Sequence, residues 1–420
     1  MLNISELGLI SLKKVNIQED ITELDCSENE LETLEGIEKC INLTKLNCCG
    51  NCIKTLKGLE NCINLTELNC GNNILETLEF FTRVKVKCIN LTKLDCVYNK
   101  LKTLEGIEKC VNLVKLDCRY NKLETLEGID KCVNLIILCC SFNKIETLKG
   151  LEKYINLTIL NCRDNKLKTL KGLEKCINLT KLDCEYNKLE TLEGIEKCNK
   201  LTELNCSDNG LKSLKGLEKC INLTKLNCCS NKLKTLEGLE KCVKLADLYC
   251  EHNKLETLKE IEECVNLTIL YCYNNKLESL EWLVKCNKLT ELYCNDNKLK
   301  TLKGLDKCVN LTELSCYNNK LKTLEGLDKC INLNRLLCFN NRLETLEGIE
   351  KCNKLTKLNC SNNKLRKLKY CSESIIYIRY DDNPIKEEYR EGNIGEIHRI
   401  NKERWERSIY KEVMKEDNFI

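Results

Sequence analysis

A period of 22 residues runs through almost the whole chain, and it constrains the fold more than any other feature. The copies fit L-x-x-L-x-C-x-x-N-x-L, followed by a second half that reads x-T-L-x-G-L/I-x-K-C-x-N. A fixed period of this size predicts stacked units that share one continuous core and offer a long surface rather than a pocket. Asn383 marks a degenerate seventeenth copy, and the asparagines that align the other sixteen are Asn29, Asn51, Asn73, Asn99, Asn121, Asn143, Asn165, Asn187, Asn209, Asn231, Asn253, Asn275, Asn297, Asn319, Asn341 and Asn363.

The first half of each copy has the pattern of a short strand. Leu46 and Cys48 alternate with Lys45 and Asn47, which is the period of two expected of a strand. Because so short a strand must satisfy its backbone on neighbouring copies, we expect a parallel sheet with an advance of about 4.8 Å per repeat. The repeated asparagine is expected to bond backbone groups of adjacent copies.

The second half of each copy predicts a turn on the opposite side. Leu56 and Leu59 are three residues apart, as in a short 3₁₀ turn, and Gly58 between them suits a positive φ.

These motifs resemble the leucine-rich repeat family, with cysteine at the third leucine position. Leu56-Lys57-Gly58-Leu59-Glu60 resembles the 22-residue class found in the nuclear regulator of protein phosphatase 1 and in bacterial internalins. The resemblance covers roughly residues 20 to 390. It implies an α/β repeat solenoid, a curved horseshoe with a parallel β-sheet on the concave face and 3₁₀ turns on the convex face.

Cysteine is unusually frequent, with 35 residues in the chain. Sixteen occupy the third leucine position, from Cys26 to Cys360, and fourteen more follow the convex half, where Tyr154 replaces one. These are apolar core positions, and stacked strands would hold their Cβ atoms about 4.8 Å apart, beyond the roughly 3.8 Å of a disulfide. We therefore expect reduced thiols and a cytoplasmic, reducing location.

Metal and cofactor sites are not expected. The C-x-x-C of Cys49 and Cys52 has no second pair and no nearby histidine, so it is interpreted as a chance product of a cysteine-rich repeat. His252 and His398 are the two candidate histidine bases, and no nucleophile motif accompanies either. The chain is therefore not expected to be an enzyme.

Charge and hydropathy restrict the partners further. The formal net charge is +3, from 67 basic and 64 acidic residues, which disfavours nucleic acid. Neither a secretory signal in residues 1–20 nor an apolar run of membrane-spanning length is found, so we expect no membrane association. We expect a monomer.

The ends and irregular repeats suggest three regions. Residues 1–20 are interpreted as an N-terminal half-repeat cap, residues 21–384 as about 17 repeats, and residues 385–420 as a C-terminal helical cap. The helix is expected over 394–416. One repeat is four residues longer, around 74–90, where Phe80-Phe81 could make a contact, although loop drift is the simpler explanation. Trp282 replaces a turn glycine and should be partly exposed.

Binding residues are expected where the copies differ, on the concave face. Aromatic residues with arginine are favoured at interface hot spots, although tyrosine also stacks well across strands. The preferred patch comprises Tyr249, His252, Ile269, Tyr271, Tyr273, Tyr293, Tyr317, Arg335, Leu337 and Phe339. The second patch comprises Tyr98, Arg119, Tyr120, Ile137, Cys139, Phe142, Ile159, Arg163 and Tyr186.

The function expected is a scaffold that binds a protein partner on the concave face, without a small-molecule substrate. The resemblance also allows a surface or secreted adhesin of internalin type, or the regulatory subunit of an enzyme such as a phosphatase. Tyrosines that stack bases would allow nucleic-acid binding, but the sequence contains no basic groove.

Overall fold

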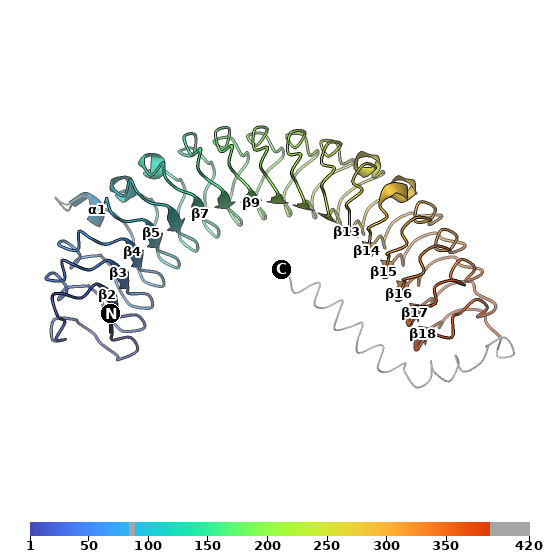
Figure 1. Cartoon of the computed structure of the whole chain (residues 1–420), viewed down its shortest axis with the longest axis horizontal. Helices are drawn as coiled ribbons and strands as arrows, with labels where there is room; N and C mark the ends of the chain where they lie inside the picture. Colours follow the sequence, from blue (N-terminus) through green and yellow to red (C-terminus); the bar gives the residue numbers. More distant parts are fainter. Residues whose placement is uncertain (84–88, 387–420) are drawn as a thin grey trace. The chain divides into compact units, whose positions relative to one another are not determined.

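The computed structural model describes residues 1–83 and 89–386, in two compact units. The first unit is Met1–Leu211 with Lys215–Leu223, and the second is Lys212–Leu214 with the described residues from Thr224 onward. Within each unit the strands lie along the concave side and the turns along the convex side (Figure 1).

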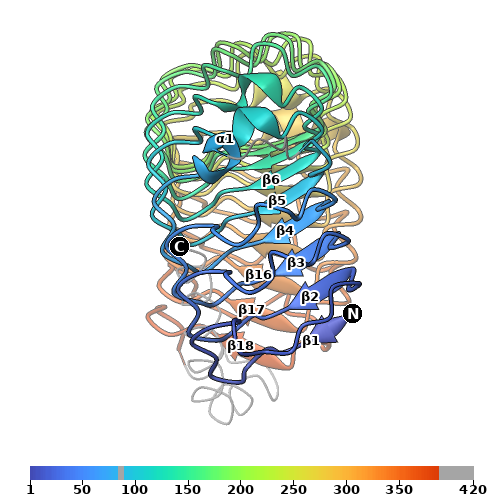
Figure 2. The same cartoon turned by 90° about the vertical axis from the view of Figure 1, so that its left-hand side faces the viewer.

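The first unit holds ten parallel strands that follow one another in chain order (Figure 2). Leucine pairs with leucine at every step, as in Leu24 with Leu46 and Leu46 with Leu68, because each copy enters the sheet in the same register. The strands are β1 (Leu2–Asn3), β2 (Glu23–Asp25), β3 (Lys45–Asn47), β4 (Glu67–Asn69), β5 (Lys93–Asp95), β6 (Lys115–Asp117), β7 (Ile137–Cys139), β8 (Ile159–Asn161), β9 (Lys181–Asp183) and β10 (Glu203–Asn205).

The second unit holds eight parallel strands in the same arrangement. Its register places Tyr249 beside Tyr271 and Tyr271 beside Tyr293. The strands are β11 (Lys225–Asn227), β12 (Asp247–Tyr249), β13 (Ile269–Tyr271), β14 (Glu291–Tyr293), β15 (Glu313–Ser315), β16 (Arg335–Leu337), β17 (Lys357–Asn359) and β18 (Tyr377–Arg379). The expected solenoid with a parallel sheet is confirmed.

The convex side is built from tight turns, some of which are short helices. Gly58 has a φ of 109°, and a Cβ there would lie 2.2 Å from the carbonyl oxygen of Leu34 in the preceding repeat, so the glycine is required for close stacking. The helices are α1 (Phe80–Arg83), η1 (Ile107–Lys109), η2 (Ile129–Lys131), η3 (Lys259–Ile261) and η4 (Glu281–Lys285), of which the four η elements are the expected 3₁₀ turns. Trp282 is half-buried in η4, as predicted.

The ladder asparagines join adjacent repeats as predicted. The Nδ2 of Asn99 donates to the carbonyl oxygens of Cys70 at 3.0 Å and Cys96 at 3.2 Å, and its Oδ1 accepts from the N–H of Leu75 at 2.8 Å. Each such amide satisfies backbone groups that the irregular loops would otherwise bury without partners.

The core consists of the repeated leucines and cysteines. All sixteen strand cysteines are buried, and the convex ones that the structure describes are buried too. The Sγ of Cys48 lies 3.3 Å from the carbonyl oxygen of Asn69 in the next repeat and can donate its S–H to it. Tyr154 replaces one convex cysteine, is fully buried and donates its hydroxyl to the carbonyl oxygen of Ile129.

The segments flanking the regular repeats are described in part. Residues 1–20 supply β1, which pairs with β2, and they bury Leu12. In the longer repeat, Phe81 is 2% exposed and takes a core position, with Phe80 packed edge-on at 5.8 Å between ring centroids. Residues 84–88, the cap helix expected over 394–416 and His398 lie outside the described residues.

Candidate binding surfaces

Three tyrosines at the ends of adjacent strands form a continuous strip on the concave face of the second unit. We call Tyr249, Tyr271 and Tyr293 the tyrosine strip. Tyr249 meets Tyr271 edge to face, with ring centroids 5.1 Å apart, and Tyr271 stacks on Tyr293 at 4.4 Å with an interplanar angle of 1°. All three are half-buried. The strand register places them in one line because they share one position in the repeat.

The strip is held by carboxylates from the following strands. The hydroxyl of Tyr271 donates to Oε2 of Glu291 at 3.0 Å, and that of Tyr293 donates to Oε2 of Glu313 at the same distance. Burial is the largest cause that raises the pKa of Tyr271, followed by the nearby Tyr293 and Glu291, so its phenol stays protonated and serves as a donor. The glutamates were missed in the sequence, although each lies 20 residues after its tyrosine, on the neighbouring repeat.

Other predicted residues of this patch lie close to the strip or in the loops after the strands. Nη1 of Arg335 lies 3.9 Å from Oε2 of Glu313. Ile269 begins β13, two residues before Tyr271. In the loops, His252 and Tyr273 meet edge to face at 5.2 Å, and Tyr317 stacks on Phe339 at 4.3 Å. Leu337 is half-buried at the end of β16.

The second patch forms a stacked column in the first unit. Tyr98 stacks on Tyr120 with centroids 4.1 Å apart, and Tyr120 stacks on Phe142 at 4.2 Å. The guanidinium carbon of Arg163 continues the row, 5.9 Å from the Phe142 centroid and 5.5 Å from that of Tyr186. We call these five residues the stacked column.

The column stands at backbone positions that disfavour aromatic side chains. Tyr98, Tyr120, Phe142 and Tyr186 have φ between 50° and 55°, in the left-handed region. That conformation costs an L-residue about 1–2 kcal/mol, whereas each stacked pair returns about 0.5–1.5 kcal/mol. Stacking in two pairs therefore returns less than the four strained positions cost. Asn274 holds the equivalent position in the second unit, where asparagine tolerates this conformation.

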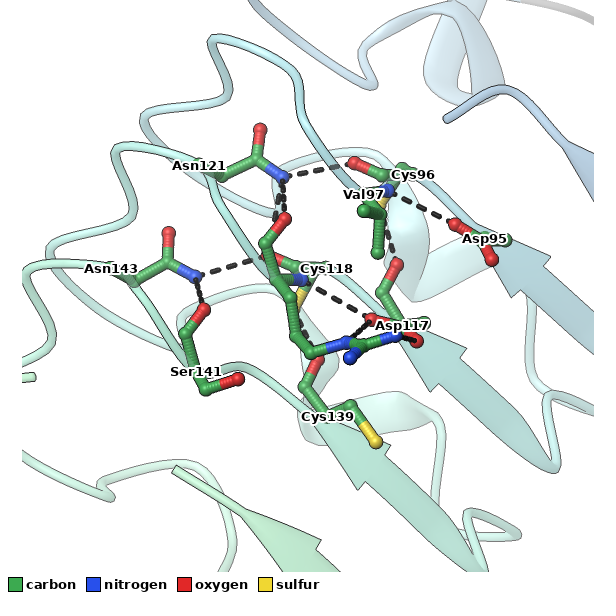
Figure 3. A network of polar contacts seen from close by, with 10 residues as sticks. Asp95, Cys96, Val97, Asp117, Cys118, Asn121, Cys139, Ser141 and Asn143 are labelled. Carbon is green, nitrogen blue, oxygen red and sulfur yellow. Dashed lines mark hydrogen bonds and ion pairs between the residues drawn. The ribbon is translucent and has the colours of Figure 1, made fainter. Parts of the chain in front are cut away.

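Polar contacts on the adjoining strands fix the two arginines of this patch. Figure 3 shows Asp117, which is buried and accepts from Nε and Nη2 of Arg119, each at 2.8 Å. Arg163 pairs through Nη1 with Glu185 at 2.8 Å. Burial raises the pKa of Asp95, despite a hydrogen bond from the N–H of Val97 at 3.1 Å.

The remaining residues of this patch lie on β7 and β8. Ile137 and Cys139 are half-buried at the two ends of β7, and Ile159 pairs with Ile137 from β8. Beside the exposed end of the column lies a hollow of about 450 Å³, and Gly71 is one of the residues that line it. Tyr98 and Arg119 line it as well. The hollow was not predicted from the sequence.

The other sites considered from the sequence have ordinary surroundings. Cys49 is half-buried and Cys52 exposed. Across residues 1–83 and 89–386, histidine, cysteine and acidic side chains form no cluster that could hold a metal ion. Within the same residues, no helix is long and apolar enough to cross a membrane.

Sequence and structure comparisons identify relatives of the repeat. The family model for leucine-rich repeats in two copies matches residues 41–83, 89–131, 111–153, 155–197, 177–219, 199–241, 221–263 and 287–329. No curated protein matches. A leucine-rich repeat protein of Leptospira interrogans is 29% identical, with a TM-score of 0.75, over 91% of this chain and 94% of that chain.

Two Listeria monocytogenes structures share the fold. The functional domain of InlJ, described as including a cysteine ladder, is 28% identical with a TM-score of 0.64, over 82% of this chain and 69% of that one. An internalin, inlF, is 20% identical with a TM-score of 0.65, over 72% of this chain and 92% of that chain. The repeat matches extend over more than half of the sequence, and the chain belongs to the leucine-rich repeat family.

Proposed function

We propose that this chain is a non-enzymatic protein-interaction scaffold, and that the tyrosine strip is its main contact with a protein partner. One observation carries the proposal: three half-buried tyrosines are aligned on the concave face of the second unit, with two hydroxyls already bonded to glutamates. Solenoids of stacked repeats in general use their extended concave surface for binding.

The geometry of the strip favours tight association. Association loses free energy when mobile side chains become ordered, so side chains fixed beforehand retain more of their contact energy. Tyr271 is fixed on both sides, by its stack on Tyr293 and by its bond to Glu291. Tyrosine also offers a large ring and a polar edge, as interface hot spots require. Ile269 and Arg335 would extend the contact to either side.

The state of the cysteines supports a reducing compartment for this scaffold. The strand cysteines are free thiols, and carbonyl oxygens of neighbouring repeats can accept their S–H groups, as that of Asn69 does for Cys48. Burial raises the pKa of Cys26 to about 12, so its thiol stays protonated and unreactive at neutral pH. A cytoplasmic location and a monomeric state complete the proposal.

Capture of a partner with matched variants tests the proposal. The full chain is immobilised, exposed to native lysate, and compared with a variant carrying Tyr249→Asn, Tyr271→Asn and Tyr293→Asn. Asparagine already stands at this position in Asn227 and Asn359, so the fold should tolerate it. The control variant carries Ile41→Asn, Ile221→Asn and Ile331→Asn, three exposed apolar residues outside both patches.

A protein retained by the wild type and the control, and lost from the strip variant, would support the strip as the site. A partner retained equally by all three chains would refute the strip, provided that all three show the same urea midpoint.

An adhesin of internalin type is the second candidate. It is favoured by one observation, because the InlJ domain is likewise described as containing a cysteine ladder. Cell fractionation distinguishes the two: recovery on the cell surface or in the medium would favour the adhesin, and recovery with cytosolic markers the scaffold. A captured enzyme whose activity changes on binding would make the scaffold a regulatory subunit.

A further inference from the structure

The stacked column presents ring edges, not ring faces, to its surroundings. Tyr120 has Tyr98 against one face and Phe142 against the other, and the Arg163 guanidinium lies between Phe142 and Tyr186. Aromatic rings carry partial negative charge on their faces and partial positive charge at their edges. A column whose faces are covered from within therefore offers a weakly positive surface.

A row of lysines accompanies the column. Each follows the ladder asparagine of its repeat, two residues after the left-handed position, and each is exposed. In the part of the chain that the structure describes, none of the five makes an ion pair or side-chain hydrogen bond, unlike Lys93, which bonds Glu67. We call this set the lysine row; it consists of Lys100, Lys122, Lys144, Lys166 and Lys188.

The lysine row begins where the column begins. In the three preceding repeats the same position holds Glu30, Cys52 and Ile74. Arg119 and Arg163 stand just before the left-handed position in their repeats and add two cations. Across these five repeats, the acidic residue at the left-handed position is Asp164, and the acidic residue just before that position is Glu185. Both arginines are already paired, Arg119 with Asp117 and Arg163 with Glu185, so the five lysines are the cations that the described part of this surface leaves without an ion pair.

The fold does not require this combination. Asparagine or aspartate fills the left-handed position in most repeats of the second unit, and the strain of the four aromatic residues exceeds what their two stacked pairs return. Strained positions that bring no net stability are a reason to look for a surface role.

We propose that the stacked column and the lysine row together form a docking surface for an acidic segment of a protein partner. Carboxylates would meet the lysine ammonium groups, and the partner chain would lie along the ring edges. Five repeats at about 4.8 Å each span roughly 19 Å between the first and last, the length of about six extended residues. This inference rests on the proposed function only in that the ligand is a protein, because the surface shares no residue with the tyrosine strip.

Nucleic acid fits this surface less well. Proteins that bind single strands stack bases on open aromatic faces, and here neighbouring rings cover both faces of Tyr120. One exposed ring end, that of Tyr98 at 52% exposure, could take at most a single base.

Fluorescence anisotropy with a labelled oligoglutamate of about ten residues, longer than the span of the row, tests the proposal on the full chain. The test variant replaces the lysine row with glutamine. The matched control makes the same number of charge changes at the same repeat position in the second unit, at Lys254, Lys276, Lys298, Lys320 and Arg342, which are equally exposed. A further variant carries Tyr98→Asn, Tyr120→Asn and Phe142→Asn.

We expect the lysine-row variant to weaken oligoglutamate binding about tenfold, and the matched control less than about twofold, as local ion pairing predicts. The aromatic variant should also weaken binding. An equal loss in both charge variants would overturn the proposal, as would failure of the wild type to bind or an unaffected aromatic variant. Tighter binding of an oligothymidylate, lost in the lysine-row variant, would assign the surface to nucleic acid instead. None of these results depends on the tyrosine strip.

Discussion

The buried thiols should make this protein unusually sensitive to alkali. Burial raises the pKa of Cys308 and of Cys316 to about 12, and both side chains are fully buried. An unfolded cysteine has a pKa of about 8.5. A group whose pKa is higher in the folded state contributes stability that is present below the unfolded pKa. That stability is lost as the pH rises from about 8.5 towards about 12.

The size of the effect follows from this window. At pH 9.5 an unfolded thiol gains about 1.4 kcal/mol from ionisation, while the folded thiol stays protonated. A regular repeat carries two such thiols, one on the strand and one on the convex side, so each repeat should lose about 3 kcal/mol between pH 7 and pH 9.5. In a solenoid these losses add along the chain.

A pair of substitutions isolates the thiol contribution. Cys308→Val and Cys316→Val together replace two ionisable core groups with apolar ones, and urea unfolding is followed at both pH values with a reductant present. Any cost of repacking cancels, because the change between the two pH values is compared. The double variant should lose about 3 kcal/mol less than the wild type over this range. If both chains lose the same free energy of unfolding, the buried thiols are not the cause of the alkaline sensitivity.

Two further predictions concern the joints between repeats. Asn319→Ala should cost about 3–5 kcal/mol in urea unfolding, because its buried amide bonds the carbonyl oxygens of Cys294 and Cys316 and accepts from the N–H of Leu299. Asn332→Ala removes two exposed bonds, one to the carbonyl oxygen of Val309 and one from Nζ of Lys354, and should cost less than about 1 kcal/mol; equal costs would refute a role for burial. Gly304→Ala should destabilise more than Gly150→Ala by at least about 1 kcal/mol. Both glycines have φ near 105°, but the added Cβ would lie 2.1 Å from a carbonyl oxygen at Gly304 and 3.4 Å at Gly150, so equal melting temperatures would contradict the steric argument.

The fold followed from the sequence because its signals repeat. The alternation around Leu46, the turn at Gly58 and the ladder asparagines each recur with the same spacing, so tertiary context has little freedom to override them. Phe81 was harder to interpret: its neighbours indicated an inserted loop, whereas the structure buries it at a core position.

The candidate surfaces were only partly predictable. Residues at the same position of successive repeats line up on the surface, and for this reason Tyr271 and Tyr120 could be predicted as members of the two patches. The orientation of the rings depends on partners in the next repeat, such as Glu291 for Tyr271, and on which neighbour fills a gap, as Arg163 does beside Phe142. The sequence alone did not predict the lysine row, because lysine is common at that repeat position. Only the aromatic residues beside it distinguish these five lysines from the others.

The bonds of the ladder asparagines have a consequence for how such a chain can change in length. Each amide recognises main-chain groups, as Asn99 does with the carbonyls of Cys70 and Cys96, and not the side chains of a particular neighbour. A duplicated unit of 22 residues would meet the same donors and acceptors wherever it was inserted. Lengthening by whole units is therefore nearly neutral for the scaffold, whereas the rows of surface side chains would be separated or extended by each insertion. Growth by duplication can thus alter what the surface recognises while the interior stays the same.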